Sequence, residues 1–195
     1  MKEIYVSVDV ESDGPIPGEN SMLSFGAAAF DPSLPLKESM VSTFEINLKQ
    51  LPEAHTNPDT MKWWQTQQEA WDYCRRDTQD PQHAMQSFNA WTESLNGKPV
   101  FVAYPAGYDF TFMYWYMIKF TGKSPYGFSA LDLKSFAMAK LGTTFKGTTK
   151  KNMPKSWFTK HPHNHKALDD AIGQGWLFMN MKNDESTRST EKQGR

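Results

Sequence analysis

IYVSVDV, the stretch at residues 4–10, alternates β-branched with other residues, as expected of a β-strand. A loop rich in glycine and proline follows at 14–18, and MLSFGAAAF at 22–30 predicts a second strand whose small residues suit close packing beneath a neighbour. A third alternating stretch, VSTFEINL, occupies 41–48. Because short loops join these three strands, we expect them to form an antiparallel meander.

After the meander the pattern becomes helical, with further short strands. The apolar run PVFVAY at 99–104 is bounded by turn residues, which predicts a buried and parallel strand, and 127–130 predicts a short fifth strand. The predicted helices cover residues 58–64, 66–76, 81–95, 109–121, 132–141 and 166–181. The fold class is therefore α/β, with a mixed five-stranded sheet flanked by helices.

The remaining segments predict irregular structure. Residues 142–164 carry glycine, proline and threonine punctuation and predict a loop with at most a short ordered turn. Residues 183–195 lack apolar side chains, which predicts a disordered tail after one domain at 1–182.

Length and composition limit the class of protein. A chain of 195 residues suffices for one well-cored domain. The single cysteine, Cys74, rules out an intramolecular disulfide and a zinc site of several thiolates. The first residues do not resemble a signal peptide, and no apolar run approaches the roughly 20 residues that span a bilayer. We therefore expect a cytoplasmic protein with no membrane partner.

The net charge of −1 conceals an uneven distribution. The segment from Leu133 to Leu168 contains no aspartate or glutamate. Such a segment is either a solvated loop or a surface that holds the phosphates of a polyanion. Its position directly before His165 and Asp170 favours substrate binding. Its eight lysines are Lys134, Lys140, Lys146, Lys150, Lys151, Lys155, Lys160 and Lys166.

Asp9 and Glu11 end the first predicted strand. Alternation along a strand points residues i and i+2 to the same side, so the two carboxylates are neighbours. Burying either carboxylate without a cation costs a free energy on the order of several kcal/mol, because the charge is then unpaired. A hard divalent cation removes that penalty. The alternative for so short a motif is an exposed strand end with two ordinary surface acids.

Two further carboxylates stand at the starts of helices. Asp109 lies in YPAGYDFTF, directly after the buried strand at 99–104. His165 and Asp170 lie in HKALDDA, at the start of the last predicted helix. A histidine on the loop before that helix is free to reach a substrate beside a metal held by Asp170.

The trio VDVES, GYDF and HKALDDA, in this order, resembles the three motifs of the DEDDh superfamily of 3′–5′ exonucleases. That superfamily includes oligoribonuclease, ribonuclease T and the proofreading subunit of bacterial DNA polymerase III. DGPIPGENSMLSFGAAAF further resembles a less-studied bacterial group of exonuclease-like proteins. The resemblance spans about residues 4–181 and implies a ribonuclease H-like fold. One departure is Tyr104-Pro105, where many relatives carry His-Asn, which puts a substrate contact from that asparagine in doubt.

The resemblance implies catalysis by two divalent cations, Mg²⁺ or Mn²⁺. Asp9, Glu11 and Asp170 would hold one ion. Asp9 would also hold the second ion, together with Asp109, which would bind it through a water molecule. His165 would act as general base, and nucleoside 5′-monophosphates would leave. His161 and His163 compete with His165, but the five-residue offset to Asp170 selects His165, and Asp169 falls at the wrong offset.

Aromatic and basic side chains are the candidates for holding the nucleic acid. For Phe25 core packing is an equal alternative, and a helix cannot bury Trp63 and Trp64 equally. The candidates are Ser12, Met22, Phe25, Trp63, Trp64, Tyr104, Tyr108, Lys150 and Lys151. The expected substrate is a single-stranded 3′ end of RNA or DNA, and likeness to relatives suggests a homodimer. The rival interpretations are a non-catalytic nucleic-acid-binding module on the same fold and a ribonuclease H-like endonuclease.

Overall fold

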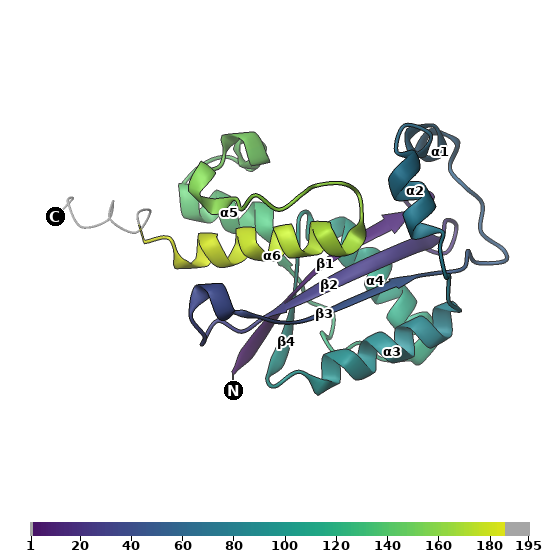
Figure 1. Ribbon diagram of the computed structural model, residues 1–195, viewed down its shortest axis with the longest axis horizontal. Helices are drawn as coiled ribbons and strands as arrows, with labels where there is room; N and C mark the ends of the chain where they lie inside the picture. The colour runs from purple at the N-terminus through teal and green to yellow at the C-terminus, as the bar shows by residue number, and fades with distance from the viewer. Residues whose placement is uncertain (1, 186–195) are drawn as a thin grey trace.

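The computed structural model describes residues 2–185, and its centre is a five-stranded sheet in the order β3-β2-β1-β4-β5 (Figure 1). The antiparallel part pairs β1 with β2 and β2 with β3, and the parallel part pairs β1 with β4 and β4 with β5. This confirms the predicted mixed sheet of a meander followed by parallel strands. The strands are β1 (Glu3–Ser12), β2 (Met22–Phe30), β3 (Met40–Asn47), β4 (Lys98–Ala103) and β5 (Leu131–Asp132).

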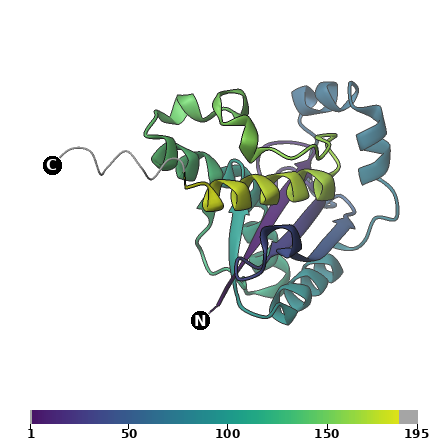
Figure 2. The same ribbon diagram turned by 60° about the vertical axis from the view of Figure 1, so that its left-hand side comes forward.

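Helices cover both faces of the sheet, and Figures 1 and 2 show α6 lying across one of them. The core on the other face joins the sheet to α3 (Pro81–Ser94) and α4 (Ala106–Thr121) through residues such as Phe88 and Met113. The core on the first face joins it to α5 (Leu133–Leu141) and α6 (Ala167–Asn183) through Leu133 and Phe178.

The alternation of β1 divides its side chains between these two cores. Val6, Val8 and Val10 belong to the core that includes α3 and α4. Tyr5 points to the opposite face, where its ring lies 4.6 Å from that of Phe178 in α6. Asp9 and Glu11 have the same parity as Tyr5, so they share one side of β1, as predicted, and that side is the one that α6 covers.

Two short helices stand beyond the end of β1 (Figure 1). They are α1 (Pro58–Trp64), capped by Asn57, and α2 (Gln68–Cys74). The Trp64 indole N–H donates to the carbonyl of Ser12 at 2.9 Å, which ties α1 to the last residue of β1.

Three segments differ from their predictions. Residues 127–130 form no strand: Gly127 adopts a left-handed turn conformation (φ 64°), and β5 starts only at Leu131. The predicted loop 142–164 contains three short 3₁₀ helices, η2 (Phe145–Thr148), η3 (Lys150–Asn152) and η4 (Lys155–Trp157). A fourth 3₁₀ helix, η1 (Leu36–Glu38), precedes β3.

The disordered tail was predicted to begin at residue 183, but residues 183 and 184 are ordered in the structure. Asn183 is the last residue of α6, and the carboxylate of Asp184 accepts from the Trp157 indole at 2.5 Å. Residues 186–195 lie outside the described residues. Between residues 2 and 185 no helix combines the length and apolar character needed to cross a membrane.

Candidate active site

The carboxyl end of β1 meets the first turns of α4 and α6, and the predicted carboxylates gather there. One ligand oxygen each from Asp9, Glu11 and Asp170 lies within 4.8 Å of the others. The approach of α6 depends on Gly26, which pairs with Asp9 across β1 and β2. A Cβ at Gly26 would stand 2.3 Å from the backbone of Leu168, so only glycine lets the first turn of α6 rest on the sheet.

Asp109 joins this group from the other side of β1. It lies in the first turn of α4 and is only 4% exposed. Its Oδ1 accepts a hydrogen bond from the backbone N–H of Val10 at 3.0 Å. The bond holds the start of α4 against the strand residue between Asp9 and Glu11. All four predicted carboxylates are therefore brought together.

Burial and repulsion between the carboxylates dominate the electrostatics of the group. Burial, followed by the charges of Asp109, Glu11 and Asp170, raises the pKa of Asp9 well above its usual value. Burial and the Asp170 charge do the same to the pKa of Glu11. Burial raises the pKa of Asp109 to about 7, although the Val10 N–H acts in the opposite direction. These donors fit hard divalent cations, which take oxygen ligands and remove the repulsion.

Gln174 belongs to the site, and the sequence reasoning missed it. Its side chain is buried, and its amide nitrogen donates to Asp9 Oδ1 at 2.5 Å. Its amide oxygen accepts from the backbone N–H of Tyr104 at 2.9 Å, which fixes the orientation of the amide. The available signal was its spacing, because Gln174 follows Asp170 by one helical turn on the same face of α6.

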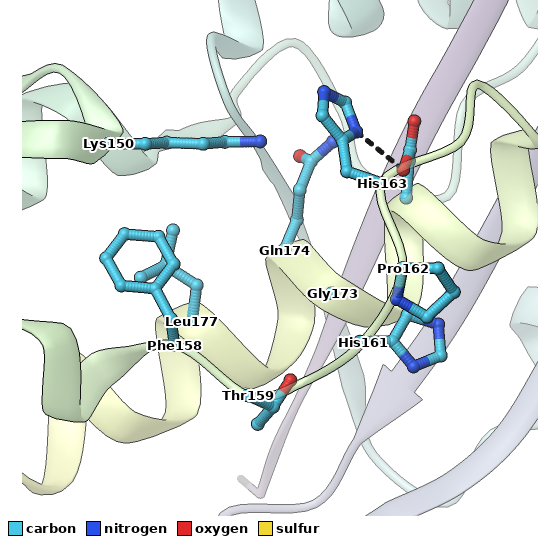
Figure 3. Close-up of a pocket in the computed structure, with 10 residues that line it drawn as sticks. Lys150, Phe158, Thr159, His161, Pro162, His163, Gly173, Gln174 and Leu177 are labelled. Carbon is cyan, nitrogen blue, oxygen red and sulfur yellow. Dashed lines mark hydrogen bonds and ion pairs between the residues drawn. The ribbon is translucent and has the colours of Figure 1, made fainter.

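Two histidines reach Asp170 from the loop that precedes α6. His163 Nδ1 lies 2.7 Å from Asp170 Oδ1, the contact dashed in Figure 3. The His165 ring lies 5.0 Å from the His163 ring and edge-on to Trp63 at 4.9 Å. Burial and the neighbouring His163 lower the pKa of His165 below its usual value. Spacing alone had set His163 aside, whereas the tertiary structure places both rings beside Asp170.

The contacts of the Asp169 carboxylate are with the loop that precedes α6. Its Oδ2 accepts from the amide of Asn164 at 2.8 Å, and its Oδ1 lies 3.7 Å from His161 Nε2. Asn164 in turn accepts from the backbone N–H of Lys166 at 3.1 Å. These contacts hold the loop against α6. Within this loop, His165 has a left-handed backbone conformation (φ 58°).

The lysines of residues 133–168, the segment without aspartate or glutamate, differ in their surroundings. Lys150 lines a pocket of about 120 Å³ beside Asp170, and its side chain extends toward Gln174 and His163 in Figure 3. Its charge opposes the rise in the pKa of both Asp9 and Asp109.

Other lysines of this segment have protein partners. Lys166 pairs with Glu69 at 2.7 Å, and Lys140 donates to the carbonyl of Asp184 at 2.5 Å. Lys151 is exposed on η3.

Several predicted substrate contacts are wrong in this structure. Met22 and Phe25 are fully buried, and the Phe25 ring packs against Phe44 and Phe88 in the core. Trp64 is buried as well, because its ring fills the small core beneath α1 and α2. These three side chains offer no surface for a base.

The other polar and aromatic candidates lie around the opening of the site. Trp63 is exposed beside His165, and Tyr108 is exposed with its hydroxyl 2.6 Å from that of Ser12. Tyr104 is half-buried, donates to the Thr148 carbonyl at 2.7 Å, and has the Lys150 ammonium 5.3 Å from its ring centroid. Tyr104 therefore supports Lys150 instead of presenting a free face.

Comparison with known families matches nearly all of this chain. The model described as the 3′-5′ exoribonuclease Rv2179c-like domain matches residues 5–181. The 3′-5′ DNA exonuclease Cap18 of Escherichia coli is 35% identical over 189 residues, which cover 91% of this chain and 90% of Cap18.

Solved structures share the architecture at low sequence identity. The nuclease domain of 3′hExo, a DEDDh family member bound to rAMP, has a TM-score of 0.69 at 10% identity and covers 94% of each chain. Pop2p of S. pombe, in a form with Mg²⁺ and Mn²⁺ bound, has a TM-score of 0.59 at 13% identity, covering 96% of this chain and 86% of Pop2p. This likeness confirms the ribonuclease H-like fold.

Proposed function

Because the chain belongs to the family of Rv2179c-like 3′–5′ exoribonuclease domains, we propose that it hydrolyses nucleic acid from a single-stranded 3′ end by two-metal-ion catalysis. Membership makes it a 3′–5′ exonuclease, a hydrolase of phosphodiester bonds. The observation that carries the mechanism is the convergence of ligand oxygens from Asp9, Glu11 and Asp170 within 4.8 Å, with Asp109 bonded to the intervening Val10.

The proposed cofactors are two Mg²⁺ or Mn²⁺ ions. Asp9, Glu11 and Asp170 would hold one, and Asp9 with Asp109 the other. The raised pKa values of Asp9 and Glu11 support this, because the buried carboxylates lack the positive charge that a divalent cation supplies. Bound metal supplies the activation of water and the neutralisation of charge on the leaving oxygen.

His165 is proposed as the general base that takes the proton of the attacking water. Its lowered pKa keeps the imidazole neutral at pH 7, the form that accepts a proton. Its loop position leaves the ring beside Asp170 and in a T-shaped contact with Trp63. The released product is then a nucleoside 5′-monophosphate.

Substrate positioning falls to the exposed side chains around the opening. Trp63 and Tyr108 offer rings for stacking, which contributes roughly 1–3 kcal/mol per base. Lys150 extends toward the carboxylate group and is placed to meet a phosphate. The family model is described as an exoribonuclease and Cap18 as a DNA exonuclease, so both polymers belong in the test.

Digestion of 5′-labelled oligomers tests the function. RNA and DNA, single- and double-stranded, are incubated with Mg²⁺ or Mn²⁺ and with EDTA. We expect stepwise shortening from the 3′ end and release of nucleoside 5′-monophosphates only with metal. Asp9→Ala and Asp170→Asn should lose this activity while keeping the wild-type circular dichroism spectrum, whereas Asp169→Asn, the same charge change one position away, should keep it.

The outcomes separate the rival functions. Full activity in either Asp9→Ala or Asp170→Asn rejects the metal assignment. Binding of the oligomers with no release of mononucleotides identifies a non-catalytic nucleic-acid-binding module. Cleavage of a circular single-stranded substrate identifies an endonuclease.

His165→Ala tests the base. Turnover should fall about 10²–10⁴-fold, the usual contribution of a general base, while Mg²⁺ binding by calorimetry stays at the wild-type level. In the unaltered protein the rate should rise with pH through a midpoint below 6.5, because the imidazole must be neutral. His83→Ala, an exposed histidine on α3, is the control. Wild-type turnover in His165→Ala would remove the residue from the mechanism.

A further inference from the structure

A second group of ligand atoms adjoins the carboxylates and differs from them in chemistry. One ligand atom each from His163, His165 and Asp170 lies within 4.8 Å of the others. Two of these donors are imidazole nitrogens, whereas the first group offers only carboxylate oxygens. Asp170 belongs to both groups and stands between them.

The fold holds the two imidazoles in place. His163 Nδ1 already lies 2.7 Å from Asp170 Oδ1, and the Trp63 ring stands edge-on to His165. The backbone of His165 is left-handed (φ 58°), and its ring centroid lies 5.0 Å from that of His163. His163 is exposed, so the group opens to solvent.

This donor set selects a different class of metal ion. Mg²⁺ prefers six oxygen ligands, whereas imidazole suits zinc, copper, nickel and iron. Two histidines and one carboxylate form a three-ligand set of the kind that binds Zn²⁺ and leaves a fourth position for water.

We propose that His163, His165 and Asp170 form a binding site for a borderline transition-metal ion such as Zn²⁺, and that occupation of this site inhibits the exonuclease. The bound ion withdraws Asp170 from the carboxylate group and uses the ring nitrogen of His165. Excess Mg²⁺ relieves this inhibition poorly, because it competes weakly for imidazole. The inhibition rests on the proposed function of His165 and Asp170; the metal site itself does not.

Binding is measured with Zn²⁺ by calorimetry, and with Co²⁺ by its visible absorption, in the full chain with saturating Mg²⁺. One ion per chain should bind, and the Co²⁺ bands should report nitrogen ligands at low coordination number. His163→Gln should weaken binding by roughly 10–100-fold or more. His161→Gln, a change in the same loop at a histidine that faces Asp169, should bind as the wild type does.

Activity is measured in parallel, with Mg²⁺ fixed and Zn²⁺ increased. The wild type and His161→Gln should be inhibited, whereas the Mg²⁺-dependent rate that His163→Gln retains should resist Zn²⁺. Wild-type Zn²⁺ affinity in His163→Gln overturns the site, and binding that depends on His163 without loss of rate overturns the inhibition. A chain that binds Zn²⁺ through His163 but releases no mononucleotides supports the site and rejects the proposed function.

Discussion

Asp9 has the other three carboxylates of the site and the Gln174 amide as neighbours. It shares the ligand group with Glu11 and Asp170, and the charge of Asp109 acts on it as well. The only hydrogen bond that the described structure gives its carboxylate comes from Gln174. That donor fixes one oxygen of Asp9 and leaves the other for a metal ion.

Gln174→Leu should therefore impair metal use without removing a ligand. We expect a loss of roughly 10–100-fold in Mg²⁺ affinity or in activity, because residues that orient metal ligands contribute on this scale. Activity measured against Mg²⁺ concentration should show a raised requirement that high Mg²⁺ partly overcomes.

The matched control for Gln174 lies on the same helix. Asn180→Leu removes an amide that donates to the Trp157 carbonyl at 2.9 Å, far from the carboxylates along α6. It should lower stability and leave the Mg²⁺ requirement unchanged. Equal Mg²⁺ curves for Gln174→Leu and the wild type would show that Asp9 needs no positioning.

At the scale of elements, the site depends on how closely α6 approaches the sheet. Gly26 lies beneath Ala167 and Leu168, and Gly175 lies against the ring of Phe30. Both are places where a side chain would meet atoms that are already packed. The small residues of MLSFGAAAF therefore allow the first turn of α6 to bring Asp170 beside Asp9.

Gly26→Ala should push the first turn of α6 from β2. The added methyl would meet backbone at 2.3 Å, so we expect a destabilisation of about 1–3 kcal/mol and a strong loss of exonuclease activity. Denaturant unfolding and the oligomer assay measure the two effects. Gly107→Ala, in α4 with no atom within 4 Å of its Cβ position, should not destabilise the protein. Wild-type stability of Gly26→Ala would refute the close approach.

At the scale of the whole molecule, the carboxylate group links stability to pH and to metal. A carboxyl whose pKa is raised on folding binds protons in the folded state that the unfolded chain has lost. The stability of the metal-free protein should therefore fall as pH rises from about 4, the unfolded value, to about 7, the pKa of Asp109. Bound Mg²⁺ replaces the protons and stabilises the folded state by mass action.

Thermal unfolding between pH 5 and pH 8, with EDTA and with Mg²⁺, measures this linkage. The gain in Tm from Mg²⁺ should increase with pH, at about 2–4 °C for each kcal/mol in a chain of this size. Asp109→Asn, which removes one of the raised carboxyls, should reduce the pH dependence seen in EDTA. A Tm gain from Mg²⁺ that stays constant across this range would contradict the linkage.

Most of the fold followed from local patterns. Alternation placed β1 and β2, and it put Asp9 and Glu11 on one face, because side-chain direction in a strand is a local property. The strand predicted at 127–130 was wrong, because two residues of parallel pairing leave no periodicity to read. The ordered turns within 142–164 lack apolar periodicity as well.

The sequence by itself determined the four carboxylates and the family, since the motifs are contiguous stretches of chain. Only the tertiary structure decided which other side chains contact these carboxylates. Gln174 reaches Asp9 across 165 residues of chain, and Met22, Phe25 and Trp64 turned out to be core. Spacing places Gln174 on the same face of α6 as Asp170, but its contact with Asp9 depends on how α6 packs against the sheet, just as the burial of Trp64 depends on how α1 packs. The same packing brings His163 and His165 together on Asp170.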